Sequence, residues 1–178
     1  MLYLKVLNTA DARQQYEFLT ACPSSHGFEN PYADYSYEEF VREAIPSRID
    51  ASEGQNLPQG YVPDTYFFLW DDDRVVGVFK VRHFLTDFLR DGGGHIGYAI
   101  HPDFRGRGYA TEGLKLAVQE LVQLPDFDDD EIYFACYKSN PASLKVQLNV
   151  GAYIHHETDD HYYTRLKVDQ LKHLSVVP

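Results

Sequence analysis

The chain has 178 residues with 16 basic and 27 acidic side chains, which gives a formal net charge of −11. This length suits one domain with a core large enough to need no metal or disulfide staple, and a hydrophobic content of 44% argues against disorder. The acidity excludes nucleic acid and anionic membrane as the main partner, because phosphate binding needs a basic face, and it fits a cationic partner better.

The first residues contain no apolar signal-peptide core, and no apolar run reaches the ~18 residues of a membrane span. Two cysteines, Cys22 and Cys136, form no disulfide framework, so we expect a cytoplasmic protein. Cys136 lies in an apolar run and is expected to be a buried small hydrophobe.

Residues 1–7 alternate as a short strand, and a helix is expected from about Asp11 to Ala21. The segment 22–64 is different, because it is rich in Pro, Gly, Ser and Tyr. Within this segment Ser36 and Glu39 have capping-box spacing and predict the start of a second helix.

We expect this second helix to end before Pro46, since a proline disfavours helical backbone in the residue before it. The stretch 47–64 is then a loop, and so long a connection inside a compact domain is usually functional.

The rest of the chain is read from apolar periodicity and turn residues. We expect strands at 66–70, 75–82, 95–101, 131–137, 153–156 and 162–168, and helices at 107–122 and 141–151. The order βααβββαβαββ predicts an α/β (α+β) domain whose sheet is mostly antiparallel and carries a βαβ insertion.

The strongest chemical signal is an apolar strand that runs into a tight loop and then a helix, over residues 95–111. Gly106 and Gly108 allow backbone N–H groups to approach a ligand closely, and Arg105 and Arg107 add positive charge. The helix N-terminus adds positive partial charge. The segment therefore predicts an anion cradle, most suited to a diphosphate, and it is not a Walker A loop because no Gly-Lys-Ser/Thr follows.

The run from Arg105 through Gly108 to Ala110 resembles the signature of the GNAT superfamily of acyl-CoA-dependent N-acyltransferases, Arg/Gln-x-x-Gly-x-Gly/Ala. A second mark of the family is an asparagine at the end of the fifth strand with a small residue three positions later. The run Asn140-Pro-Ala-Ser143 resembles it, and a helix and a glycine follow before an aromatic strand. The resemblance covers residues 65–167 well and 1–64 only in element order. Within the superfamily, the run 93–98 looks like a bacterial subgroup without an assigned substrate.

The resemblance implies a single domain with a mixed, mostly antiparallel central sheet flanked by helices. Residues 65–167 would form the βαβ acyl-CoA-binding core, 1–64 the acceptor-side helices and loop, and 168–178 a C-terminal tail. The donor would be acetyl-CoA or a longer acyl-CoA, with no metal. Its diphosphate would lie on the loop and its pantetheine arm along the fourth strand. The donor-binding residues implied are Tyr98, Ala99, Ile100, Arg105, Gly106, Arg107, Gly108, Tyr109, Ala110, Thr111, Asn140 and Ser143.

The resemblance also implies that an amine attacks the thioester directly, which requires a base for the amine and a proton for the departing thiolate. Two common family choices are replaced, by Ala135 on the fifth strand and by Gln147 seven residues after the family asparagine, so neither role transfers. The catalytic candidates are His95 and Tyr98; His95 has an ordinary pKa near 6.5, and a merely hydrogen-bonded strand-end histidine is the open alternative.

The remaining candidates face the acceptor. We expect the substrate side to use Glu29, Tyr32, Arg82 and His83, with Glu29 and His83 also open as the base. A water relay to a distant carboxylate is equally open.

The predicted function is acetyl transfer to the primary amine of a small, cationic molecule. Residues 1–64 carry 4 basic and 10 acidic side chains, so the acidity is concentrated on the expected acceptor side, although solubility explains it as well. The alternatives are a non-catalytic acyl-CoA-binding or regulatory protein and a protein or peptide N-acetyltransferase. A homodimer is left open.

Overall fold

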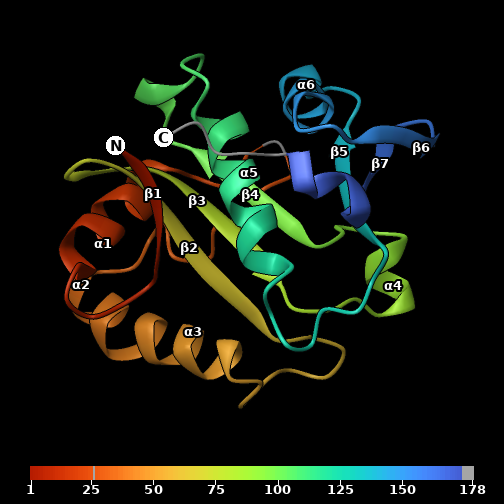
Figure 1. The fold of residues 1–178 in the computed structure, drawn as a ribbon. Helices are drawn as coiled ribbons and strands as arrows, with labels where there is room; N and C mark the ends of the chain where they lie inside the picture. The colour runs from red at the N-terminus through yellow and green to blue at the C-terminus, as the bar shows by residue number, and fades with distance from the viewer. Residues whose placement is uncertain (26, 174–178) are drawn as a thin grey trace.

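A long hairpin of β2 (Asp64–Asp71) and β3 (Arg74–Arg82) forms the middle of the computed structural model, which describes residues 1–25 and 27–173 (Figure 1). Apolar and aromatic side chains occupy both faces of these strands, so the hairpin is buried on both sides. The strands β1 (Leu2–Val6) and β4 (Ile96–Ile100) pair with its two edges, and all three pairings are antiparallel. The order of this sheet is β1-β2-β3-β4.

A second sheet contains the C-terminal strands β5 (Glu131–Tyr137), β6 (Tyr153–Glu157) and β7 (His161–Lys167). Its order is β5-β7-β6, and both pairings are again antiparallel. The predicted α/β fold with antiparallel strands and flanking helices is confirmed. Its described strands form two sheets, however, and not the single central sheet that we expected.

The two sheets touch at one end of β4 through backbone atoms. An isolated β-bridge joins Gly94 to Phe134, and the His95 N–H donates to the Tyr133 carbonyl (2.8 Å). Gly94 has φ +63°, and a Cβ there would lie 2.2 Å from the Tyr133 oxygen. Only a glycine therefore permits this approach.

Two hydrophobic clusters cover the two faces of the four-stranded sheet. On one face α5 (Tyr109–Leu121) lies across β3 and β4 (Figure 1). On the other face the sheet packs against α1 (Ala12–Ala21) and the helical segment after Ser36. The helix α6 (Pro141–Asn149) contacts α5 and β5.

The prediction that the second helix ends before Pro46 is wrong. The capping box at Ser36 is present and starts α2 (Tyr37–Glu39), but the helix continues through a π-helical turn, η1 (Phe40–Ala44), into α3 (Ile45–Ser52). The Ile45 N–H donates to the Phe40 carbonyl five residues earlier, and this wider turn accommodates the ring of Pro46 in the first turn of α3. Part of the expected loop 47–64 is therefore helical.

Two shorter segments add to the predicted order. A short helix α4 (Asp87–Arg90), capped by Thr86, lies in the connector before the glycine run. The expected tail begins with a 3-10 helix, Val168–His173, whose Val168 and Leu171 pack on the main core. The remainder of that tail, 174–178, lies outside the described residues.

Both cysteines are buried and unpaired, as Cys136 was expected to be. In the described part of the chain, no helix combines the length and the apolar character that crossing a bilayer requires.

The contact between the sheets yields a stability prediction. Replacing Gly94 by Ala forces a Cβ against the Tyr133 backbone in a left-handed conformation, so we expect the free energy of unfolding to fall by roughly 2–4 kcal/mol. Gly93→Ala is the matched control, because its Cβ would meet the Arg82 guanidinium at an ordinary 3.5 Å. Urea unfolding of both variants measures the difference, and equal stability would show that the backbone contact is dispensable.

Candidate active site

The outer edge of β4 carries backbone groups that point away from β3. The His101 N–H donates to the Val76 carbonyl (3.0 Å), and hydrogen bonding alternates along an antiparallel strand. The N–H and C=O groups of Tyr98 and Ile100 therefore point outward, and the Ile100 carbonyl accepts a hydrogen bond from Arg105 Nε (3.1 Å). The N–H and C=O of Tyr98 and the N–H of Ile100 have no partner in the part of the chain that the structure describes, so they can bond a ligand.

The register changes one expectation for this edge. Ala99 pairs with Val78, so its own N–H and C=O point into the sheet rather than toward a ligand. The backbone contribution of the strand thus comes from Tyr98 and Ile100.

The loop between β4 and α5 has the form of an anion cradle. Gly106 and Gly108 have φ +76° and +84°, and a Cβ on either one would meet no atom within 4 Å. Among the described residues, no acceptor is found for the N–H groups of 106–110, because the first bonds of the α5 turn come from Thr111 and Glu112 to the Gly108 carbonyl. These free N–H groups at a helix N-terminus fit a diphosphate.

Two side chains of residues 106–110, those of Tyr109 and Arg107, contact residues outside this run. The Tyr109 hydroxyl donates to Asp71 Oδ2 (2.6 Å), which ties the start of α5 to the β2–β3 turn. Arg107 is exposed and lies over the ring of Phe104, with 5.5 Å from Cζ to the centroid. Both flanking arginines are thus near the open glycine loop.

A hydrogen-bonded group of side chains bridges β4 and α6. The Tyr98 ring stacks on Phe79, and its hydroxyl bonds Ser143 Oγ (2.8 Å). Ser143 is in the first turn of α6, where its N–H donates to Asn140 Oδ1 (3.2 Å). Burial raises the pKa of Tyr98 to about 12, so its hydroxyl stays protonated at neutral pH.

Gln147 completes this group and explains one departure from the family pattern. It is 1% exposed, it accepts from the Thr164 hydroxyl (2.8 Å), and its amide lies 3.4 Å from Ser143 Oγ. Gln147 is therefore a buried structural amide beside the Tyr98–Ser143 pair.

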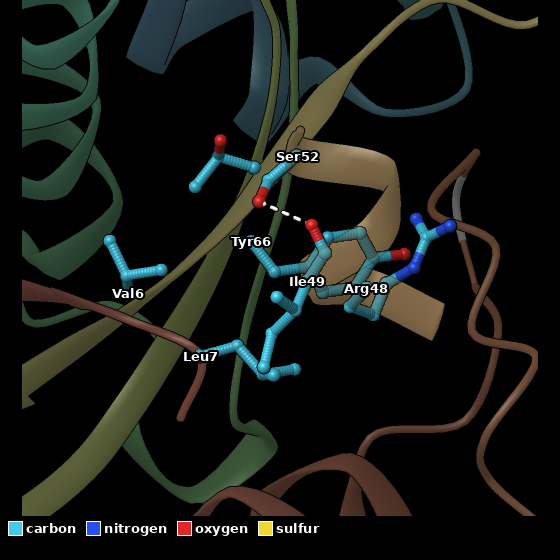
Figure 2. A pocket seen from close by; sticks show the side chains of 7 residues that line it. Val6, Leu7, Arg48, Ile49, Ser52 and Tyr66 are labelled. Carbon is cyan, nitrogen blue, oxygen red and sulfur yellow. Dashed lines mark hydrogen bonds between the residues drawn. The ribbon is translucent and has the colours of Figure 1, made fainter. Parts of the chain in front are cut away.

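A cleft of about 420 Å³ opens on the face of the sheet opposite α5. It is lined by Ser24, Glu29, Asn30, Pro31, Tyr32, Arg48, Tyr61, Tyr66 and Lys80. A second hollow, of about 10 Å³, lies between β1, β2 and α3 and has room for roughly one water molecule (Figure 2). In Figure 2 the Arg48 guanidinium points away from Val6 and Leu7, and Arg48 also lines the larger cleft.

The family model for the acetyltransferase (GNAT) domain matches residues 2–153. The chain belongs to the GNAT acetyltransferase family. It is therefore an acyl-CoA-dependent N-acetyltransferase. No curated protein matches its sequence significantly.

Solved structures of GNAT enzymes are similar to this chain in fold. A ribosomal-protein-S5-alanine acetyltransferase from Vibrio fischeri superposes with a TM-score of 0.68 at 15% identity, covering 96% of this chain and 94% of that one. A spermidine N-acetyltransferase chimera from Vibrio cholerae and hSSAT gives 0.64 at 15%, covering 97% and 98%. The aminoglycoside acetyltransferase AAC(6')-Ib in complex with coenzyme A gives 0.65 at 14%, covering 97% and 98%.

The catalytic candidate His95 lies at the contact between the sheets and not in the cleft. Its side chain is fully buried, Nδ1 accepts from the Tyr133 N–H (3.0 Å), and Nε2 lies 3.2 Å from Asp129 Oδ2. Since Nδ1 accepts, Nε2 carries the proton and donates to Asp129. Both ring nitrogens are occupied, so the imidazole has no free lone pair to offer an amine.

Two of the four substrate-side candidates line the cleft, and two are held by the protein itself. Glu29 and Tyr32 are cleft residues. Arg82 Nη1 donates to the Gly94 carbonyl (2.8 Å), and the buried His83 bonds the Thr65 hydroxyl through Nε2 (2.8 Å). Burial lowers the pKa of His83, which keeps this ring neutral.

The cleft also contains ionic residues that the sequence patterns did not single out. Arg48 and Lys80 both pair with the buried carboxylate of Asp64. A lysine inside the apolar run of β3 was the available signal, since charged residues are rarely placed in a buried strand without a partner. In contrast, most acidic side chains of residues 1–64 are exposed, and among the residues lining the cleft Glu29 is the acidic one.

The environment of His95 predicts a pH-dependent stability. Burial lowers the pKa of His95 below its ordinary 6.5. Between these two pKa values the unfolded chain binds a proton on His95 and the folded protein does not, which favours unfolding. The contribution of the neutral His95 to the free energy of unfolding is therefore fully present above pH 6.5. It is lost as the pH falls from 6.5 through the lower pKa of the folded state. We expect wild type to lose more stability between pH 7.5 and 5.0 than His95→Asn does, as measured by urea unfolding.

The variant should also be less stable at pH 7.5, because it lacks part of the contact to Asp129. Parallel stability curves for the two proteins would contradict the buried, neutral imidazole.

Proposed function

We propose that the protein transfers an acetyl group from acetyl-CoA directly to the primary amine of a small molecule. One observation carries this proposal: backbone N–H groups without a partner among the described residues run from Tyr98 and Ile100 on the β4 edge to the glycine loop before α5. Such a run suits a ligand with an amide-containing arm and a diphosphate, which is the chemistry of coenzyme A.

The residues present fit that donor. The N–H groups of 106–110 would receive the diphosphate, with Arg105 and Arg107 beside them. The outward N–H of Ile100 would polarise the thioester carbonyl as an oxyanion-hole donor does. Asn140 and Ser143 start α6 beside the Tyr98 hydroxyl and would border the pantetheine arm.

Two side chains are suited to the proton transfers. The Tyr98 hydroxyl is protonated, buried and close to α6, so we assign it the proton that the departing thiolate needs. Glu29 is the carboxylate that lines the cleft, so we assign it the amine's proton, taken directly or through water. His95 is assigned the positioning of β4 against β5.

The cleft favours a small acceptor, because its volume of about 420 Å³ matches a small-molecule site. A protein or peptide N-terminus is the alternative acceptor. Thiol release from acetyl-CoA separates the two: turnover of peptide N-termini alone would favour the protein or peptide acceptor, and turnover of small amines supports the proposal.

The cradle predicts the effect of a charge at Gly108. Gly108→Asp places a carboxylate into open space at the glycine loop, where it would repel a diphosphate, so we expect the Kd for coenzyme A to rise at least tenfold and acetyl-CoA-dependent thiol release to fall with it. Calorimetry measures the affinity. Gly60→Asp is the matched control, since Gly60 has φ +85° and equally open surroundings. An unchanged Kd for Gly108→Asp would remove the loop from the donor site.

The assignment of Tyr98 predicts a defect in kcat. Tyr98→Phe keeps the stack on Phe79 but removes the hydroxyl, so kcat should fall roughly 100-fold with little change in the KM for acetyl-CoA. Wild-type activity should show no alkaline decline from this group below about pH 10, because its pKa is raised to about 12. Steady-state kinetics over pH 6–10 checks both points, and a kcat equal to that of wild type would exclude Tyr98 as the acid.

A further inference from the structure

The floor of the cleft contains more positive than negative charge. Arg48 and Lys80 line the cleft, and both contact the one carboxylate of Asp64, at 2.9 Å from Arg48 Nη1 and 3.5 Å from Lys80 Nζ. Asp64 is 2% exposed, so this ion group is largely shielded from water. One carboxylate cannot neutralise two cations.

A third cation lies near this ion group. Arg82 follows Lys80 on the same face of β3 and donates a hydrogen bond to the neutral Gly94 carbonyl. Burial lowers the pKa of Arg82, and the charges of Asp64 and Glu29 oppose this effect, so three cations face two carboxylates. Burial lowers the pKa of Lys80, and the charges of Arg82 and Arg48 add to this effect while Asp64 opposes it. The three cations are therefore close enough to repel one another.

One nitrogen of the Arg48 side chain lacks a hydrogen-bond partner among the described residues. This nitrogen, Nε, is buried. The Arg48 side chain as a whole is 15% exposed and lines the cleft, so an anionic ligand there would add the negative charge that the ion group lacks.

The cations also lie at a defined position relative to the donor edge. Lys80 pairs across β3 and β4 with Gly97, the residue before Tyr98. A Cβ on Gly97 would meet no atom within 4 Å, so the space above this residue is open. An anion held by Lys80 would thus lie beside the strand edge assigned to the acyl donor.

We propose that the acceptor is zwitterionic: a primary amine with a carboxylate or phosphate a few bonds away. Lys80 and Arg48 bind the anionic group, and Glu29 faces the amine from the wall of the same cleft. The rings of Tyr32, Tyr61 and Tyr66 flank the body of the molecule. This inference rests on the proposed function. In it the two cations of the cleft bind the anionic group of the acceptor, and the carboxylate of Glu29 faces its amine.

The first test uses matched ligands and the wild-type protein. Each α-amino acid of a panel is compared with its α-amide, and phosphoethanolamine is compared with ethanolamine. Binding to the protein loaded with coenzyme A is measured by calorimetry, and turnover by thiol release from acetyl-CoA. We expect the anionic member of at least one pair to bind at least tenfold more tightly, and the pair that shows the preference identifies carboxylate or phosphate as the anion.

A variant locates the preference in the cleft. Lys80→Gln should reduce affinity for the anionic member at least tenfold and leave affinity for coenzyme A and for the partner ligand that lacks the anionic group nearly unchanged. Arg42→Gln is the control, because Arg42 is exposed and pairs with Glu43 outside the cleft.

The outcomes separate this inference from the function on which it rests. If amines without a carboxylate or phosphate bind and react as well as those that carry one, the zwitterionic acceptor is overturned and acetyl transfer stands. A preference that survives in Lys80→Gln would also overturn it, as would the absence of binding by every ligand. Anion-selective binding without thiol release from any acceptor would overturn the proposed transfer and retain the anion site.

Discussion

The short backbone contact between Gly94–His95 and Tyr133–Phe134 is the constraint on which the site depends. His95 contributes twice, because its N–H donates to the Tyr133 carbonyl and its Nδ1 accepts from the Tyr133 N–H. Beyond this contact, in the part of the chain that the structure describes, β4 and β5 belong to different sheets. An unpaired strand edge is normally a liability for aggregation. Here the edge lies next to the glycine loop before α5, so we propose that its outward backbone groups bind a ligand that has amides of its own.

The alternation of side chains along β4 divides the chemistry between two faces of one sheet. Tyr98 points to the face covered by α5 and reaches Ser143 on α6. Its neighbour Gly97 points to the opposite face, where Lys80 lies across the strand pair and the cleft opens. Adjacent residues of one strand therefore border the proposed donor and acceptor sides. No long loop is needed to bring the two sides together, because a single peptide unit separates them. This arrangement follows from strand geometry alone.

Local patterns predicted the elements, and long-range contacts decided the roles. The strands and the glycine–arginine cradle were readable because periodicity and turn residues act over a few positions. The continuation of the helix past Pro46 was missed because the π-helical turn that accommodates it leaves no simple signature. The environment of His95 could not be read from its neighbours, since Asp129 and Tyr133 follow more than thirty positions later. The ion group of Arg48, Asp64 and Lys80 likewise combines one helix with two strands.

The replacement of two familiar catalytic positions does not by itself indicate a lost activity. Gln147 cannot supply a proton to a thiolate, because an amide is not an acid at neutral pH, and the structure uses it instead as a buried partner of Thr164 and Ser143. The hydroxyl that Gln147 helps to surround comes from Tyr98, on the strand rather than on the helix. The hydroxyl that we propose as the proton donor thus approaches α6 from β4, and the Gln147 amide contacts the serine to which that hydroxyl is bonded. In our proposal the proton donor is therefore Tyr98 on β4 instead of a residue at position 147 on α6. The helix contributes Ser143 and Gln147, which hold the Tyr98 hydroxyl in place.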